Sequence, residues 1–173
     1  MDYWDIIWDK IINDPSIKHE YRIAFLLNIF QKLCSKMNKN DEYRHHVFKL
    51  YRQSFDFKET TCIIIQKEYG IPLNEEDSTY ISEWIEAYIK KESKRKMIPQ
   101  SVKEELYKKQ NGLCAACGQP LGDQWGNIHV DHIIPWVLVG DELKDNYQDL
   151  CETCNRCKSS KTDYIFKKLL YLD

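Results

Sequence analysis

The stretches CAACG at residues 114–118 and CETCN at residues 151–155 decide the predicted fold of the C-terminal part of this chain. Each holds a Cys-x-x-Cys pair, and the two-residue spacer lets both sulfurs of a pair reach one ion. Gly118 follows the first pair and can take the positive φ of a tight turn. Four thiolates favour a closed, tetrahedral and structural zinc site. The predicted ligands of this structural Zn²⁺ are Cys114, Cys117, Cys151 and Cys154.

The other three cysteines have different predicted roles. Cys157 is a rival ligand, because Cys154 and Cys157 form a further Cys-x-x-Cys pair. We prefer Cys151, because Cys157 would then fall on a following helix turn. Cys34 and Cys62 have apolar neighbours and are predicted core residues.

The bulk composition is that of an ordinary globular protein. Of the 173 residues, 43% are hydrophobic and 30% are charged, which argues against global disorder. No apolar run approaches the roughly 20 residues that span a bilayer, and the acidic residues 1–5 lack the pattern of a signal peptide. We therefore expect no membrane association and a cytoplasmic location, where thiols stay reduced and bind metal ions.

The sequence HVDHIIP, residues 129–135, lies between the two cysteine pairs and carries chemically active side chains. Asp131 offers a hard anionic oxygen and Asn155 a neutral carbonyl oxygen, ligands that suit Mg²⁺ or Mn²⁺ better than zinc. His132 could take a proton from water near neutral pH. Because the zinc ligands draw the second cysteine pair back towards the segment before Asp131, the structural ion is expected to help assemble this second metal site.

Residues from about 102 to 161 resemble the HNH endonuclease family of the ββα-metal class, in its zinc-knuckle form. The resemblance rests on order, spacing and residue type together. The motifs are Cys114-x-x-Cys117, the HVDHIIP segment, NYQDLC at residues 146–151 and CNRCK at residues 154–158.

The resemblance implies roles for individual residues in the hydrolysis of a DNA phosphodiester bond with one metal ion. His132 matches the general base, Asp131 the adjacent metal ligand, and Asn146 the residue that braces the loop presenting the base. Asn155 matches the last signature position, where many relatives have histidine. Val139-Gly140 departs from the paired glycines common in relatives, so the conformation of that loop stays open.

Basic residues near the motif are expected to hold the nucleic-acid backbone. The net charge is −2, but a nearly neutral protein can still carry a local basic strip. The predicted phosphate-binding residues are Arg156, Lys158 and Lys161.

The first part of the chain has the apolar periodicity of helices. Residues 60–69 are ambiguous, because the isoleucine run favours a strand while its polar neighbours favour a helix; we predict a helix. Asn74 is a predicted N-cap, followed by acidic residues that favour the helix dipole. The predicted helices are residues 4–12, 21–37 (the buried central helix), 42–54, 60–69 and one that begins after Asn74.

Pro99 and its neighbours mark the predicted domain boundary. Residues 101–104, SVKE, have the pattern of a capping box that opens a helix to residue 110, which Asn111-Gly112 would close. We expect an α+β protein with a mainly helical region, residues 1–97, followed by a ββα-metal nuclease domain, residues 98–173.

Two functions from different classes follow. The first is a metal-dependent DNA endonuclease, by analogy in restriction or phage defence, whose N-terminal helices contact a protein partner or a second copy. The alternative is a zinc-stabilised nucleic-acid-binding or scaffold module that does not cut.

Overall fold

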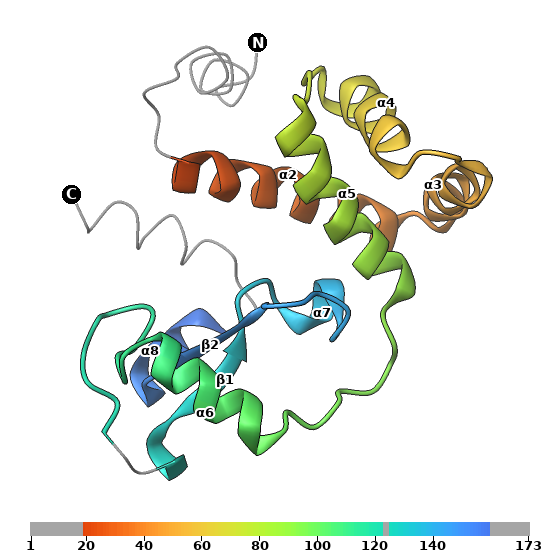
Figure 1. The fold of residues 1–173 in the computed structure, drawn as a ribbon. Coiled ribbons are helices and arrows are strands. Elements are labelled where there is room, and N and C mark those ends of the chain that lie inside the picture. Colours follow the sequence, from red (N-terminus) through yellow and green to blue (C-terminus); the bar gives the residue numbers. More distant parts are fainter. Residues whose placement is uncertain (1–18, 123–124, 160–173) are drawn as a thin grey trace. The chain divides into compact units, whose positions relative to one another are not determined.

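The computed structural model describes residues 19–122 and 125–159 (Figure 1). The chain divides into two compact units, residues 1–89 and 90–173. The first unit is helical and the second combines a small antiparallel sheet with short helices, so the predicted α+β class is confirmed. The predicted domain boundary after residue 97 stays a prediction about which parts fold independently.

The first unit consists of four described helices, which follow the predicted ones closely. The predicted helix at residues 4–12 lies outside the described residues. The bounds are α2 (His19–Lys39), α3 (Asp41–Gln53), α4 (Phe57–Tyr69) and α5 (Glu75–Lys90).

Polar side chains that precede three of these helices cap their N-termini. The amide of Tyr43 donates to Asn40 Oδ1 (2.9 Å) at the start of α3, and the amide of Asp77 donates to Asn74 Oδ1 (2.8 Å) at the start of α5. Asp56 accepts from two amides at the start of α4. The predicted helix over the isoleucine run is thus confirmed, with Ile64 and Ile65 buried while Ile63 is exposed.

The core of the first unit lies between α2 and α5. Leu26 and Phe30 on α2 are fully buried, and the ring of Phe30 lies 5.9 Å from that of Trp84 on α5. Asp77, at the start of α5, is buried and forms an ion pair with Arg22. The predicted burial of the central helix is therefore confirmed.

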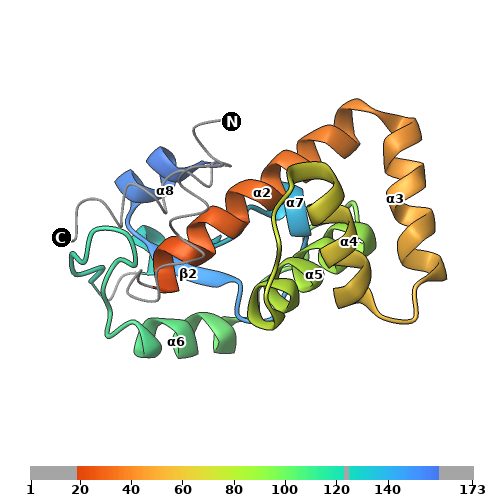
Figure 2. The ribbon, with the colours of Figure 1, turned by 90° about the horizontal axis from the view of Figure 1, so that it is seen from above.

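The second unit places a two-stranded sheet beside three helices. After α6 (Gln100–Lys109) come a 3₁₀ turn (Trp125–Asn127), β1 (His129–His132), α7 (Trp136–Val139), β2 (Tyr147–Leu150) and α8 (Glu152–Lys158). In Figure 2, β2 lies between α6 and α8.

The capping box predicted at residues 101–104 is wrong. Helix α6 begins at Gln100, because the Pro99 carbonyl already accepts hydrogen bonds from the amides of Val102 and Lys103. Ser101 therefore lies inside the first turn, where its side chain caps nothing. The helix ends where predicted. Asn111 and Gly112 both have positive φ, and the Gly112 amide donates to Tyr107 O.

The sheet separates neighbouring site residues onto opposite faces. The strands are antiparallel, with Asp131 opposite Gln148 and His132 opposite Tyr147. Opposed residues share a face and successive residues alternate. Asp131 consequently faces α8, whereas His132 shares its face with Tyr147, whose ring lies 4.8 Å away.

The linker segment, residues 91–99, is hydrogen-bonded to α7 and to the loop that follows it. Lys91 Nζ donates to the Val137 carbonyl (2.7 Å), and the Lys96 amide donates to Asp141 Oδ2 (2.9 Å). Gly140 has a φ of +62°, and a Cβ at this position would lie 2.8 Å from the Cβ of Lys91. A single glycine therefore meets both the backbone and the packing requirement of this loop.

No helix among the described residues is long and apolar enough to cross a membrane.

Candidate functional site

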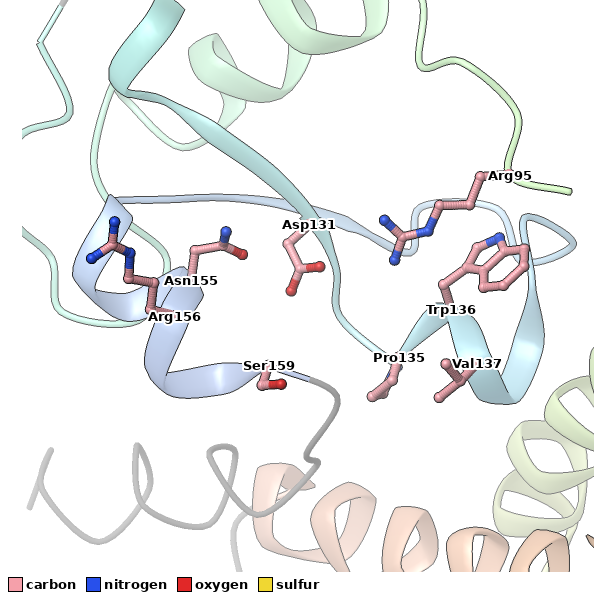
Figure 3. A pocket seen from close by; sticks show the side chains of 8 residues that line it. All are labelled: Arg95, Asp131, Pro135, Trp136, Val137, Asn155, Arg156 and Ser159. Atoms are coloured by element: carbon pink, nitrogen blue, oxygen red, sulfur yellow. The ribbon is translucent and has the colours of Figure 1, made fainter.

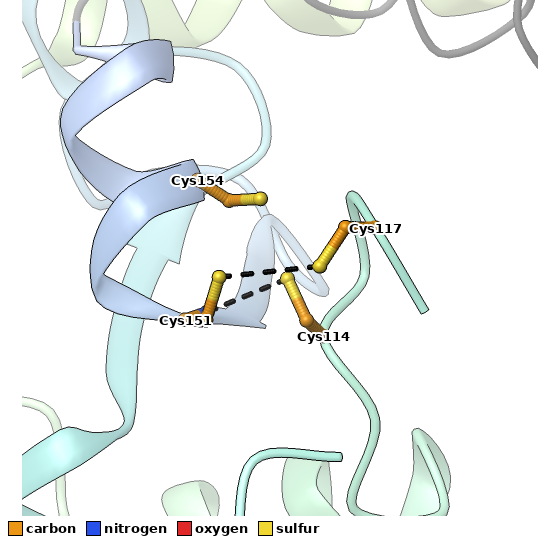
Figure 4. A group of neighbouring side chains, drawn as sticks. All are labelled: Cys114, Cys117, Cys151 and Cys154. Atoms are coloured by element: carbon orange, nitrogen blue, oxygen red, sulfur yellow. Dashed lines mark hydrogen bonds between the residues drawn. The ribbon is translucent and has the colours of Figure 1, made fainter. Parts of the chain in front are cut away.

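The four predicted zinc ligands form one cluster (Figure 4). Their sulfurs all lie within 4.8 Å of one another, and Cys117 Sγ is 4.0 Å from Cys151 Sγ. A tetrahedral ion with Zn–S bonds of about 2.3 Å would need sulfurs about 3.8 Å apart, so the cluster fits zinc. Cys157, the rival ligand, is exposed and lies outside the cluster.

Two short backbone turns position these sulfurs. The first pair lies on a turn closed by the Gly118 amide on Cys114 O (2.9 Å), and Gly118 has a φ of +71°. The second pair bridges the end of β2 and the start of α8. The Ala115 amide donates to Asp149 O (3.0 Å), which fastens the first turn to β2.

The surroundings of Cys114 favour its thiolate. Burial alone would raise the pKa of this thiol, but amides of Cys151, Cys117 and Ala116 outweigh it and lower the pKa to about 7. The Cys151 amide, for example, lies 3.4 Å from Cys114 Sγ. N–H groups that stabilise a thiolate also suit a metal-bound sulfur.

Asp131 and Asn155 line one pocket of about 370 Å³ (Figure 3). Asp131 comes from β1. Asn155 lies near the start of α8, where its backbone amide donates to the Cys151 carbonyl. The pocket is lined by Arg95, Asp131, Pro135, Trp136, Val137, Asn155, Arg156 and Ser159.

Lys158 is turned towards Asp131. Its Nζ lies 2.7 Å from Asp131 Oδ2, and its side chain is only 2% exposed. Arg156, by contrast, is exposed and forms an ion pair with Glu152. Contact of Lys158 with nucleic acid stays a prediction, and Lys161 lies outside the described residues.

Asn146 joins the segment after β1 to the start of β2. Its Oδ1 accepts from the Ile134 amide (2.8 Å) and its Nδ2 donates to the Ile134 carbonyl (3.0 Å). The Ile133 amide also donates to Asn146 O (2.9 Å). These bonds hold the backbone that leaves His132.

His132 does not line the pocket that holds Asp131 and Asn155. Its side chain is 5% exposed and its Nε2 lies 2.9 Å from Asp141 Oδ1. Asp141 also accepts from Trp136 Nε1 (3.0 Å), the Tyr147 hydroxyl (3.3 Å) and the Lys96 amide (2.9 Å). Sequence reasoning missed Asp141, because nothing in the surrounding residues distinguishes it from an ordinary loop carboxylate.

The Asp141 contacts fix the protonation of His132. Burial would raise the pKa of Asp141, but hydrogen bonds from Lys96, Trp136 and His132 outweigh it and hold the pKa below its ordinary value. A carboxylate only accepts, so His132 Nε2 donates to it and Nδ1 keeps the lone pair of the neutral ring. Burial lowers the pKa of His132, against the opposing effect of Asp141, and so favours this neutral form.

We expect Asp141→Asn to destabilise the second unit by about 2 kcal/mol or more at pH 7, because several donors lose a charged acceptor. Since the pKa of Asp141 is depressed in the folded protein, its contribution is fully present above about pH 4 and is lost as the pH falls. Urea unfolding of both proteins from pH 7 to pH 3 should show their difference shrinking below about pH 4. Asp145→Asn, an exposed change in the same loop, is the control, and an equal loss there would contradict the prediction.

The cysteine cluster, the two paired strands and the helix that follows them together define a ββα fold of the zinc-knuckle form. The family model described as HNH endonuclease matches residues 114–161, from the first clustered cysteine to just beyond α8. The predicted resemblance to the HNH endonuclease family is therefore confirmed for this part of the chain. The match supports nuclease activity, and with it a nucleic-acid substrate, for this domain. No curated protein and no solved structure matches the chain.

Proposed function

We propose that this protein is a metal-dependent endonuclease that hydrolyses DNA phosphodiester bonds, with His132 as general base and one divalent ion at Asp131 and Asn155. The observation that carries the proposal is the pocket in which these two oxygen-bearing side chains meet a pair of arginines. Residues so far apart in sequence share this pocket because the cysteine cluster joins the ends of the motif.

The donor sets fit two different ions. The four clustered sulfurs suit structural Zn²⁺, whereas carboxylate and amide oxygens suit Mg²⁺ or Mn²⁺. When bound, the divalent ion would supply positive charge that stabilises the charge developing on the phosphate. Lys158 Nζ already lies 2.7 Å from Asp131 Oδ2. The divalent ion therefore has to share this carboxylate with Lys158 or displace the lysine from it.

The protein's own groups would prepare the proton transfer. Asp141 holds the Nε2 proton of His132, which leaves Nδ1 to accept a proton from the attacking water. Arg156, exposed at the pocket edge, would hold the phosphate backbone. Since His132 is buried on the other face of β1, this strand has to distort before His132 and Asp131 can both face one bound substrate.

A second candidate function is a zinc-stabilised nucleic-acid-binding module that does not cut. The burial of His132 away from the pocket favours this reading, because such a histidine also serves as a plain structural partner of Asp141. The zinc cluster and the arginines would serve binding equally well.

The wider setting rests on analogy and on exposed apolar side chains. We propose a cytoplasmic protein acting in restriction or phage defence. Its helical first unit would contact a protein partner or a second copy, which the exposed Phe55 and Ile63 support.

The test is nicking of supercoiled plasmid with Mg²⁺, with Mn²⁺ and with EDTA, with zinc content measured after each incubation. We expect cutting with either ion, none with EDTA, and a rate at least about a hundredfold lower for His132→Ala. His46→Ala, an exposed histidine of the first unit, should cut at the wild-type rate. Wild type that binds the plasmid without cutting it under any divalent ion would favour the second candidate.

A further inference from the structure

Arg95 brings a positive charge into the candidate site from outside the family match. It lies in the linker segment, upstream of the matched residues 114–161, yet it lines the same pocket as Asp131 and Asn155. Figure 3 shows Arg95 and Arg156 on opposite sides of Asp131. The pocket is therefore flanked by guanidinium groups from two separate parts of the chain.

One ring contact and the anchored backbone of the next residue hold Arg95 in this position. Its guanidinium carbon lies 5.3 Å from the centre of the Trp136 ring. Trp136 is itself oriented by its hydrogen bond to Asp141, which also accepts from the amide of Lys96, the next residue along the chain. The arginine is thus pre-organised by stacking on one side and by its backbone on the other.

Arg95 differs from the neighbouring basic residues Arg156 and Lys158 in its ion pairs. Within residues 19–122 and 125–159, no aspartate or glutamate forms an ion pair with it, whereas Arg156 pairs with Glu152 and Lys158 with Asp131. A planar guanidinium that is held in place at a pocket and lacks an anionic partner is suited to bind a phosphate.

We infer that Arg95 is a substrate-binding residue whose guanidinium contacts a backbone phosphate of the DNA strand bound in this pocket. The inference rests on the proposed function, because it takes the pocket as the place where the strand lies. It extends the proposed nucleic-acid-binding surface beyond residues 114–161, which the family model matches, into the linker segment.

Binding of a short fluorescein-labelled DNA duplex, with Ca²⁺ in place of Mg²⁺, tests this inference by anisotropy over a range of salt concentrations. We expect Arg95→Ala to weaken binding about tenfold and to reduce the slope of log Kd against log salt by about one. Arg95→Met retains an apolar side chain against Trp136 without the charge, and we expect it to match Arg95→Ala. Lys94→Ala, an exposed neighbour outside the pocket, should stay within about twofold of wild type.

The outcomes separate this inference from the proposed function. Wild-type affinity and slope in Arg95→Ala, or wild-type affinity in Arg95→Met, would overturn the phosphate contact even if the protein cuts DNA. Weaker binding in both variants supports the contact even if the wild-type protein never cuts, in which case only the nuclease proposal fails. Absence of DNA binding by the wild-type protein would overturn the inference.

Discussion

Serine in place of Cys114 is expected to release zinc and to cost the second unit most of its folded structure. The buried apolar residues around the cluster are few, namely Cys114 itself, Leu121, Ile128 and Leu150. Such a small core cannot offset the conformational entropy of the surrounding loops, whereas binding of a structural zinc ion contributes on the order of 10 kcal/mol. The metal should therefore be a condition of folding for this half of the chain.

Two measurements test this prediction. Elemental mass spectrometry gives the zinc content per chain, and circular dichroism follows thermal unfolding. Cys114→Ser should hold no stoichiometric zinc and lose the transition of the second unit. Cys157→Ser removes an exposed thiol outside the cluster and should keep both the zinc and the transition. Zinc-free wild-type protein with an unchanged transition would contradict the zinc site itself.

Asp131→Asn is expected to reduce DNA cutting by at least about a hundredfold, because the amide is a much weaker ligand for a hard divalent ion. The same change should lower stability, since the buried ammonium of Lys158 loses its carboxylate partner. Plasmid cutting under single-turnover conditions and urea unfolding measure the two effects separately.

A double variant separates catalysis from stability at this position. In Asp131→Asn with Lys158→Met, the apolar side chain needs no anionic partner, so we expect the stability to return towards that of the wild type. Cutting should remain at the level of the single variant. If Asp131→Asn cuts like the wild type, Asp131 does not hold the ion required for the reaction.

The sequence was a good guide where local chemistry decides the structure. The cysteine cluster was predictable because the spacing of a Cys-x-x-Cys pair limits how its sulfurs can lie. The helix over Ile63, Ile64 and Ile65 was predictable only from its polar neighbours, since the isoleucines alone favour a strand. The capping box failed because the Pro99 carbonyl offered an earlier start for α6.

The candidate site was less predictable because it depends on which face each side chain takes. Adjacent residues on a strand point in opposite directions, so Asp131 and His132 cannot both face one pocket without a distortion of β1. Arg95 lies upstream of the motifs that carry the family resemblance, and Asp141 gave no signal at all. Both become visible once Trp136 is placed, because its indole contacts the two of them.

The attachment of the linker segment bears on how this protein can be shortened for crystallisation. Trimming at Pro99, the clearest break in the sequence, would keep every clustered cysteine and both strands. It would also discard Lys91, Arg95 and Lys96, which bind the carbonyl of Val137, the face of Trp136 and the carboxylate of Asp141. A fragment beginning at residue 90 retains these contacts and is the better choice for co-crystals with DNA.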